Sequence, residues 1–229
     1  MKLTKLSRIK SFRFDPIVNI KSMTMIELLV SLIVVSIMVL SFYNLEEYAH
    51  SQVIFSERRT KVQNELSYAL EHMGKYVGQA NGTKDDPGIK LIGSAFHVRV
   101  DMNNLKSPPD AQTPNNTADD AWISYSLVGN ILSTDCTPCD AVNFPGSCAS
   151  FVDEDLGSKI VSGFSNTAIP DPLPDPLTDG FYVYIDPAES NVAEVGLIGR
   201  YKPLEGAHFI KNPQVVMKVK LICNNCSTN

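Results

Sequence analysis

Five cysteines are the residues of this sequence best suited to metal or redox chemistry. Four of them form two Cys-x-x-Cys pairs, Cys136 with Cys139 and Cys223 with Cys226, and Cys148 is the fifth. Two such pairs could supply the four thiolates of a tetrahedral zinc site, whereas in an oxidising compartment the same residues form disulfides. A thioredoxin-like redox role is not expected, because neither pair lies in a βαβ pattern. The choice between zinc and disulfides therefore depends on where the chain is located.

Acidic loop residues are the second group that could do chemistry, because calcium binds to oxygen-rich loops. They form three clusters, which are Asp101 with Asn103 and Asn104, then Asp119-Asp120, then Asp153-Glu154-Asp155. Since none has the full spacing of a calcium loop, we expect solvated turns. The histidines form no ligand-spaced pair and no nucleophile constellation; they are His50, His72, His97 and His208. We therefore expect no enzyme active site, no metal and no cofactor.

The location of the chain follows from its N-terminal pattern. Residues 1–22 form a basic leader with six basic residues and one acidic residue. Residues 23–45 are apolar apart from Glu27, and as a helix they would extend about 35 Å, which is enough to cross a bilayer. Basic residues before such a span favour a cytoplasmic N-terminus, and no small-x-small cleavage site follows Leu45. We expect a single-pass membrane protein whose chain beyond about Tyr48 is exported.

Export decides what the cysteines are expected to do. An oxidising compartment favours disulfides over a zinc site. We predict one bridge between Cys223 and Cys226 and a second among Cys136, Cys139 and Cys148, with the odd cysteine free or intermolecular. Residues 23–229 hold 14 basic and 24 acidic side chains, so they should repel nucleic acids.

One long helix is predicted from Met23 to about Ala80. No proline or glycine occurs between Pro16 and Gly74, and Gly78 and Gly82 then favour a helix end. In the second half, apolar residues recur at spacings of three and four and form one stripe that must pack on something: Val62, Leu66, Ala69, Leu70, Met73 and Val77.

Residues 81–229 predict a β-rich head domain without a second strong helix. The expected strands are Ala95–Val100, Trp122–Leu127, Ile131–Ser133, Lys159–Phe164, Gly180–Ile185, Glu194–Tyr201 and Val215–Ile222. The last one alternates apolar and basic residues, which is typical of an edge strand. The fold class is therefore α+β, with an antiparallel sheet packed on the helix stripe.

The start of the apolar helix resembles the processing motif of the type IV pilins and pseudopilins. That motif is a basic leader, a cleavage site, an apolar residue, Thr, two apolar residues and Glu, and Ser22-Met23-Thr24-Met25-Ile26-Glu27 occupies it here. Ser22 stands where the family usually has Gly, and Met23 where it usually has Phe. The resemblance implies a pilin-like fold, cleavage between Ser22 and Met23 by a prepilin peptidase, and methylation of the new amine. The order of the later elements resembles, more weakly, the W-type minor pilins and the J-type pseudopilins of type II secretion.

Glu27 is a carboxylate within the apolar segment, where an unpaired charge is costly. The resemblance implies that it pairs with the Met23 amine of a neighbouring subunit and sets the axial register of a filament. The alternative is a glutamate that extends to the membrane surface. The implied partners are other pilin or pseudopilin subunits, the prepilin peptidase and an inner-membrane assembly platform.

Alternatives remain open at the level of function. Within the family, the chain could serve a type IV pilus or a type II secretion pseudopilus. A different class is a signal-anchored exported binding or zinc module, which would keep its leader. An anchored hydrolase would need a convergent polar site, which the sequence does not reveal.

Overall fold

The computed structural model describes residues 24–83, 85–101, 117–144, 146–149, 151–175 and 177–226. The longest element is helix α1, Met25–Gly78. The chain divides into two units between Tyr48 and Ala49, so the division falls within this helix. The helix predicted from the sequence is confirmed, and it ends two residues before Ala80, which instead forms an isolated β-bridge with Val100.

The first unit contributes the helical residues up to Tyr48. Its apolar side chains are exposed along the whole segment, from Met25 to Tyr48. A helix that is apolar all round is unstable as a surface helix in water, so this segment requires apolar surroundings from outside the chain.

The second unit contains a five-stranded antiparallel sheet in the order β2-β3-β4-β5-β6. In the central strands, Val98 lies opposite Ile123, and Ile123 lies opposite Cys136. The strand bounds are β2 Ile89–Ile92, β3 Ala95–Val100, β4 Ala121–Val128, β5 Ile131–Pro138 and β6 Asp155–Gly157.

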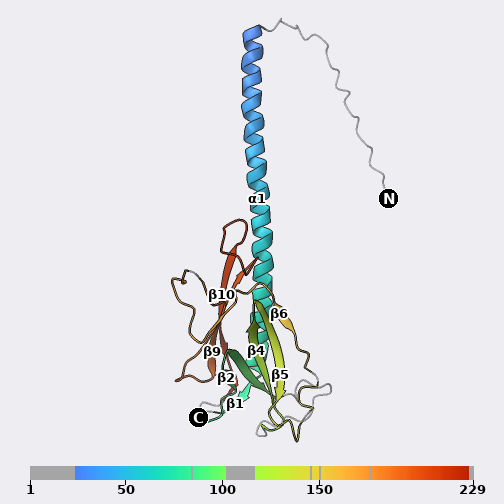
Figure 1. Cartoon of the computed structure of the whole chain (residues 1–229), viewed down its shortest axis with the longest axis vertical. Coiled ribbons are helices and arrows are strands. Elements are labelled where there is room, and N and C mark those ends of the chain that lie inside the picture. Colours follow the sequence, from blue (N-terminus) through green and yellow to red (C-terminus); the bar gives the residue numbers. More distant parts are fainter. Residues whose placement is uncertain are drawn as a thin grey trace, which may run out of the picture. The chain divides into compact units, whose positions relative to one another are not determined.

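A four-stranded sheet in the order β10-β9-β8-β7 forms the second layer of this unit, and Figure 1 shows β9 and β10 as a separate pair from β4 and β5. The pairs β10·β9 and β9·β8 are antiparallel, whereas β7·β8 is parallel. The bounds are β7 Phe164–Ser165, β8 Phe181–Ile185, β9 Val192–Arg200 and β10 Gln214–Ile222. Two short strands, β1 Asn81–Gly82 and β11 Asn225–Cys226, form a further parallel pair.

The core of the second unit lies between the stripe of α1 and both sheets. All six predicted stripe residues are buried, and Tyr76 joins them. The helix approaches β9 so closely that a Cβ atom at Gly199 would lie 2.8 Å from Val62 Cγ1 and 3.2 Å from Leu66 Cδ2. The same Cβ atom would lie 2.9 Å from the Lys159 backbone oxygen, so a larger residue at this position would force the neighbouring side chains or backbone to shift.

The outcome for the strands is mixed. Ala95–Val100 is confirmed with its predicted bounds, and β10 is an edge strand as expected. The prediction of a strand over Lys159–Phe164 is wrong, because Ile160 forms only an isolated bridge with Gly199 and pairing resumes at Phe164. The expectation of one antiparallel sheet is also wrong, because the described part of the head has two larger sheets and two parallel strand pairs.

Candidate functional site

Thr24 and Glu27 form a capping box at the start of α1. The Glu27 carboxylate Oε2 accepts hydrogen bonds from the Thr24 backbone N–H at 2.8 Å and from the Thr24 hydroxyl at 3.0 Å. In return, the Glu27 backbone N–H donates to Thr24 Oγ1 at 3.3 Å. This reciprocal pattern satisfies N–H groups that have no partner within the helix, and it places a negative charge at the positive end of the helix dipole.

The capping box is an arrangement that the sequence reasoning did not consider for Glu27. The signal was present, because Thr-x-x-Glu before an apolar run is a known helix-start pattern. Ser22 and Met23, the two residues of the predicted cleavage site, lie outside the described residues. The capped carboxylate is exposed, so it remains accessible to a partner from another molecule.

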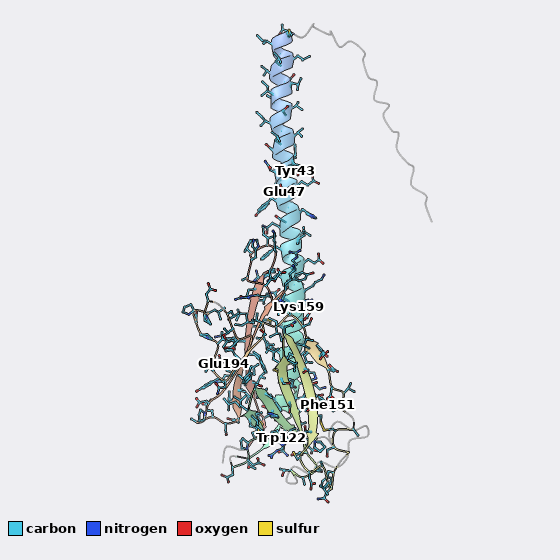
Figure 2. The ribbon with its side chains drawn as sticks, in the orientation of Figure 1. Tyr43, Glu47, Trp122, Phe151, Lys159 and Glu194 are labelled. Atoms are coloured by element: carbon cyan, nitrogen blue, oxygen red, sulfur yellow. A yellow bond between two sulfur atoms is a disulfide. The ribbon has the colours of Figure 1, made fainter. Side chains whose placement is uncertain are left out.

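The segment that follows Glu27 has the length and apolar composition of a helix that crosses a membrane, a property that signal sequences share. Its serine hydroxyls donate to backbone carbonyls of the preceding turn: Ser31 to Leu28 at 2.9 Å, Ser36 to Leu32 at 2.7 Å and Ser41 to Ile37 at 2.8 Å. These polar groups are therefore satisfied inside the helix, as an apolar environment requires. Figure 2 shows Tyr43 and Glu47 extending outward from the helix near the end of this segment.

Two disulfides are present in the head. Cys136 pairs with Cys148, which connects β5 to the loop after it, and Cys223, directly after β10, pairs with Cys226 of β11. Four of the five cysteines are therefore not available as zinc thiolates. A tetrathiolate site is therefore not formed. Its four candidate cysteines do not come together, because each disulfide links residues close in sequence.

Cys139 is the cysteine that remains free, and it is half-buried. Burial, with a contribution from the Asp120 carboxylate and against the effect of Arg99, raises the pKa of the Cys139 thiol to about 11. At neutral pH the thiol is protonated, and only the thiolate is a good nucleophile. Because the Cys139 thiol is half-buried and protonated, its surroundings disfavour the intermolecular disulfide that the sequence left open for the odd cysteine.

A buried charge cluster lies beside Cys139. Arg99 is buried and donates from Nε to the Asn81 carbonyl at 3.0 Å and from Nη1 to the Asp86 carboxylate. Its Nε lies 3.6 Å from Asp120 Oδ2, and Asp120 is fully buried. The expectation that Asp101 and Asp119-Asp120 are solvated turns is wrong, because all three side chains are buried.

The pKa of the Asp120 carboxyl is strongly affected by this cluster. Burial raises its pKa to about 6, the Arg99 charge opposes the rise, and the neighbouring carboxylates of Asp101, Asp119 and Asp86 add to it. Asn103 and Asn104, the other residues of the first acidic cluster, lie outside the described residues. Within the described part of the chain, no group of three or more His, Cys, Asp or Glu side chains is arranged to hold a metal.

The third acidic cluster has a structural role through Glu154. Its carboxylate accepts a hydrogen bond from the Tyr68 hydroxyl at 2.7 Å, and its backbone pairs with Thr134. Tyr68 belongs to α1 and Thr134 to β5, so Glu154 connects the helix to the five-stranded sheet. The hydrogen bond from Tyr68 gives Glu154 a structural role that requires no bound ligand.

A contact that the sequence did not reveal joins His97 of β3 to Ser124 of β4. The Ser124 hydroxyl lies 2.8 Å from His97 Nδ1, because the two residues are opposite each other in the sheet. Lys90 occupies the same row, and its Nζ lies 3.6 Å from the centre of the Trp122 ring. Burial lowers the pKa of His97, and the Lys90 charge lowers it further. Only the strand register places these residues together, so no spacing in the sequence could have indicated the contact.

Comparison of the chain with protein family models, with curated proteins and with solved structures gives no match.

Proposed function

We propose that this chain is a structural subunit of a type IV pilin-like filament, a minor pilin or a pseudopilin, and not an enzyme. The observation that carries the proposal is the start of α1. A Thr24-to-Glu27 capping box opens a helix that is apolar on all sides and then continues into the stripe that packs on the head. An ordinary membrane anchor needs an apolar helix, but it needs neither this motif nor a helix shared with the head.

The proposed mechanism has three steps. The chain inserts with its basic leader in the cytoplasm and its head on the exported side, as its charge pattern favours. A prepilin peptidase then cleaves between Ser22 and Met23, and the new amine is methylated. Finally, an inner-membrane assembly platform moves the subunit into a filament, where the apolar segment packs against the same segment of neighbouring subunits.

Glu27 has two successive roles in this proposal. In the isolated chain it caps the first turn of α1 through Thr24. In the filament its carboxylate pairs with the Met23 amine of the adjacent subunit, so that both charges are neutralised in an apolar surrounding. The single carboxylate of the segment thereby selects one axial register between subunits.

Mass spectrometry of the N-terminus tests the proposal directly. We expect the protein from membranes of its own host to begin at Met23 with one added methyl group, and to begin at Met1 in a strain without prepilin peptidase. A Ser22→Gly variant should be processed at least as completely as the natural chain, and the bulky Ser22→Leu variant should not be processed. A chain that begins at Met1 in both strains would reject the proposal in favour of a signal-anchored exported binding module.

A further inference from the structure

The loop between β9 and β10, residues 201–213, exposes apolar side chains where most loops are polar. Leu204 is 86% exposed and Phe209 is 69% exposed. Three basic residues accompany them on this loop and on the adjoining turn of α1, namely Lys202, Lys211 and Arg59, and all three are exposed. We call these five residues the β9–β10 loop surface.

The loop is held in one conformation by a buried side chain. Asn212 is 1% exposed, and its amide Nδ2 donates to the carbonyls of Lys202 at 2.9 Å and Gly206 at 2.9 Å, while its Oδ1 accepts from the Lys202 N–H at 2.7 Å. His208 and Asn212 exchange two further backbone hydrogen bonds. Leu204 and Phe209 are therefore presented outward by a preorganised frame, which lowers the entropic cost of contact with a partner.

The same loop is fixed to α1. The Phe209 ring stacks on Phe55 with ring centres 4.6 Å apart, and Arg58 Nη1 donates to the Lys211 carbonyl at 2.7 Å. The Arg58 guanidinium also lies 5.1 Å from the centre of the Tyr201 ring. Figure 1 shows the loop between β9 and β10 beside α1.

The chain keeps this loop near any membrane that the apolar segment enters. Phe55 follows Leu45 by ten residues, a length that cannot exceed about 35 Å even when fully extended. Val142 is also apolar and 88% exposed, but it lies in a different loop, the one after β5.

The charge of this region complements an anionic lipid surface. Around the loop, the acidic residues Glu57 and Glu205 each form an ion pair with a lysine of the same region, Lys61 and Lys202. Arg59 and Lys211 add positive charge beyond these pairs, although the exported part of the chain is acidic as a whole. Apolar side chains flanked by basic ones are the composition of interfacial membrane contacts.

We propose that the β9–β10 loop surface docks on the exported face of the membrane in which the chain is anchored, with Leu204 and Phe209 at the acyl-chain boundary and the basic residues on anionic headgroups. The inference rests on the anchored state of the proposed function, not on filament formation. It implies that the head is held on the membrane before assembly and must leave the lipid when a subunit is extracted.

Tryptophan fluorescence of the full chain in vesicles tests this docking. The natural Trp122 is replaced by Phe, and single variants Leu204→Trp, Val142→Trp and Leu40→Trp are reconstituted in phosphatidylethanolamine with phosphatidylglycerol, with or without bromine on the acyl chains. We expect brominated lipid to cause a loss of emission in the Leu204→Trp and Leu40→Trp chains and no loss in the Val142→Trp chain.

The variants separate the possible failures. If Leu40→Trp loses emission and Leu204→Trp does not, the docking inference is overturned while the anchor stands. If neither loses emission, the anchor itself is absent and the proposed function fails with it. A loss in Leu204→Trp that disappears when the protein is diluted in lipid would instead indicate contact between copies of the chain and would also overturn the inference.

Charge substitution provides a second measurement that leaves the apolar residues intact. In the Leu204→Trp background, Lys211→Gln should weaken docking about fivefold, as expected for one basic residue near an anionic surface. The matched control is Lys218→Gln on β10, which is also exposed and should change nothing. Hydrogen exchange of the unsubstituted chain should show slower exchange over residues 202–212 in these vesicles than in phosphatidylcholine alone, and equal rates would contradict the docking.

Discussion

The two halves of α1 share one backbone conformation but have different surroundings. From Met25 to Tyr48, large apolar side chains are exposed along the whole helix. Between Val62 and Val77, apolar side chains are buried in one stripe by the two sheets of the same chain. The exposed half depends on other molecules, whereas the buried half depends on the fold.

One helix can serve two partners because its two halves carry different apolar patterns. Apolar residues at spacings of three and four lie on one side of a helix, so the two sheets of a single domain are enough to bury them. A segment that is apolar on every side cannot be covered by one domain, and it needs a bilayer or a bundle of similar helices. Substitutions in the two halves of α1 should therefore have different consequences.

Removal of the Glu27 charge should have the largest effect, because under the proposed function it leaves the Met23 amine of the adjacent subunit unpaired. We expect Glu27→Ala and Glu27→Gln to insert in the membrane normally but to reduce incorporation into filaments about 30-fold or more. Thr24→Ala, which removes the capping hydroxyl but keeps the backbone N–H donor and the carboxylate, is the matched control and should assemble nearly normally. The amounts of membrane-bound and filament-bound protein are measured by fractionation and cross-linking.

The opposite result would assign Glu27 to the helix alone. A glutamine can still accept the hydrogen bonds of Thr24, so a role limited to capping predicts that Glu27→Gln assembles like the natural chain. In that case Thr24→Ala should be the impaired variant.

Truncation in the two halves should affect the head very differently. Leu66 is fully buried, so Leu66→Ala should lower the free energy of unfolding of the head by about 2–5 kcal/mol. Leu40 is 63% exposed in the apolar half, and Leu40→Ala should leave unfolding of the head unchanged. Urea unfolding of the full chain in detergent, followed by Trp122 fluorescence, provides the measurement. Equal losses in both variants would contradict the division of α1.

The head, unlike the anchor, should lose stability as the pH rises through the range in which Asp120 titrates. Because its folded pKa is raised from 3.8 to about 6, folding favours the protonated form. The loss of unfolding free energy that comes from ionising buried Asp120 is absent below pH 3.8, grows as the pH rises, and is complete above about pH 6. By that pH it amounts to about 3 kcal/mol of unfolding free energy.

An Asp120→Asn variant isolates this contribution. The difference between its pH–stability curve and that of the natural chain should show the loss between about pH 4 and pH 6, since Asn does not titrate. Asp153→Asn on the exposed loop is the control and should leave the curve unaltered. A difference curve that is flat over this range would show that folding does not raise the pKa of Asp120.

The smallest effect is expected from a polar contact between α1 and the head. Glu65 Oε2 accepts hydrogen bonds from the backbone N–H groups of Ser158 at 2.8 Å and Lys159 at 3.2 Å, and Figure 2 shows Lys159 beside the helix. Glu65→Ala should cost about 1–2 kcal/mol of unfolding free energy. Glu71→Ala, an exposed residue of the same helix, should change it by less than about 0.5 kcal/mol, and similar losses in the two would contradict a specific contact.

Much of this fold could be predicted because its signals are local. The stripe from Val62 to Val77 and the strand Ala95–Val100 follow from residue periodicity. The predicted strand over Lys159–Phe164 failed because its apolar residues fit the pattern, but Gly163 adopts a positive φ of 103° and interrupts the pairing. A local pattern does not show whether a neighbouring strand is available.

The candidate site was predictable in part. Thr24 and Glu27 are close in sequence, so the motif and its helix could be recognised before the structure, although the capping role was overlooked. Of the three cysteines in the first group, the sequence could not select Cys136 and Cys148, because that choice depends on how the loop after β5 folds back. The β9–β10 loop surface depends on Asn212, whose burial no pattern in the sequence indicated.

The sequence by itself determined an apolar helix near the N-terminus, its continuation as an amphipathic stripe, and an α+β head with a basic edge strand. These features depend on hydrophobicity and spacing over a few turns or strands, which act before any long-range contact forms. Only the tertiary structure decided which cysteines pair, that Asp120 is buried beside Arg99, and that Phe209 stacks on Phe55. Each of these joins residues brought together by strand register and loop closure, and such long-range geometry leaves no local trace in the chain.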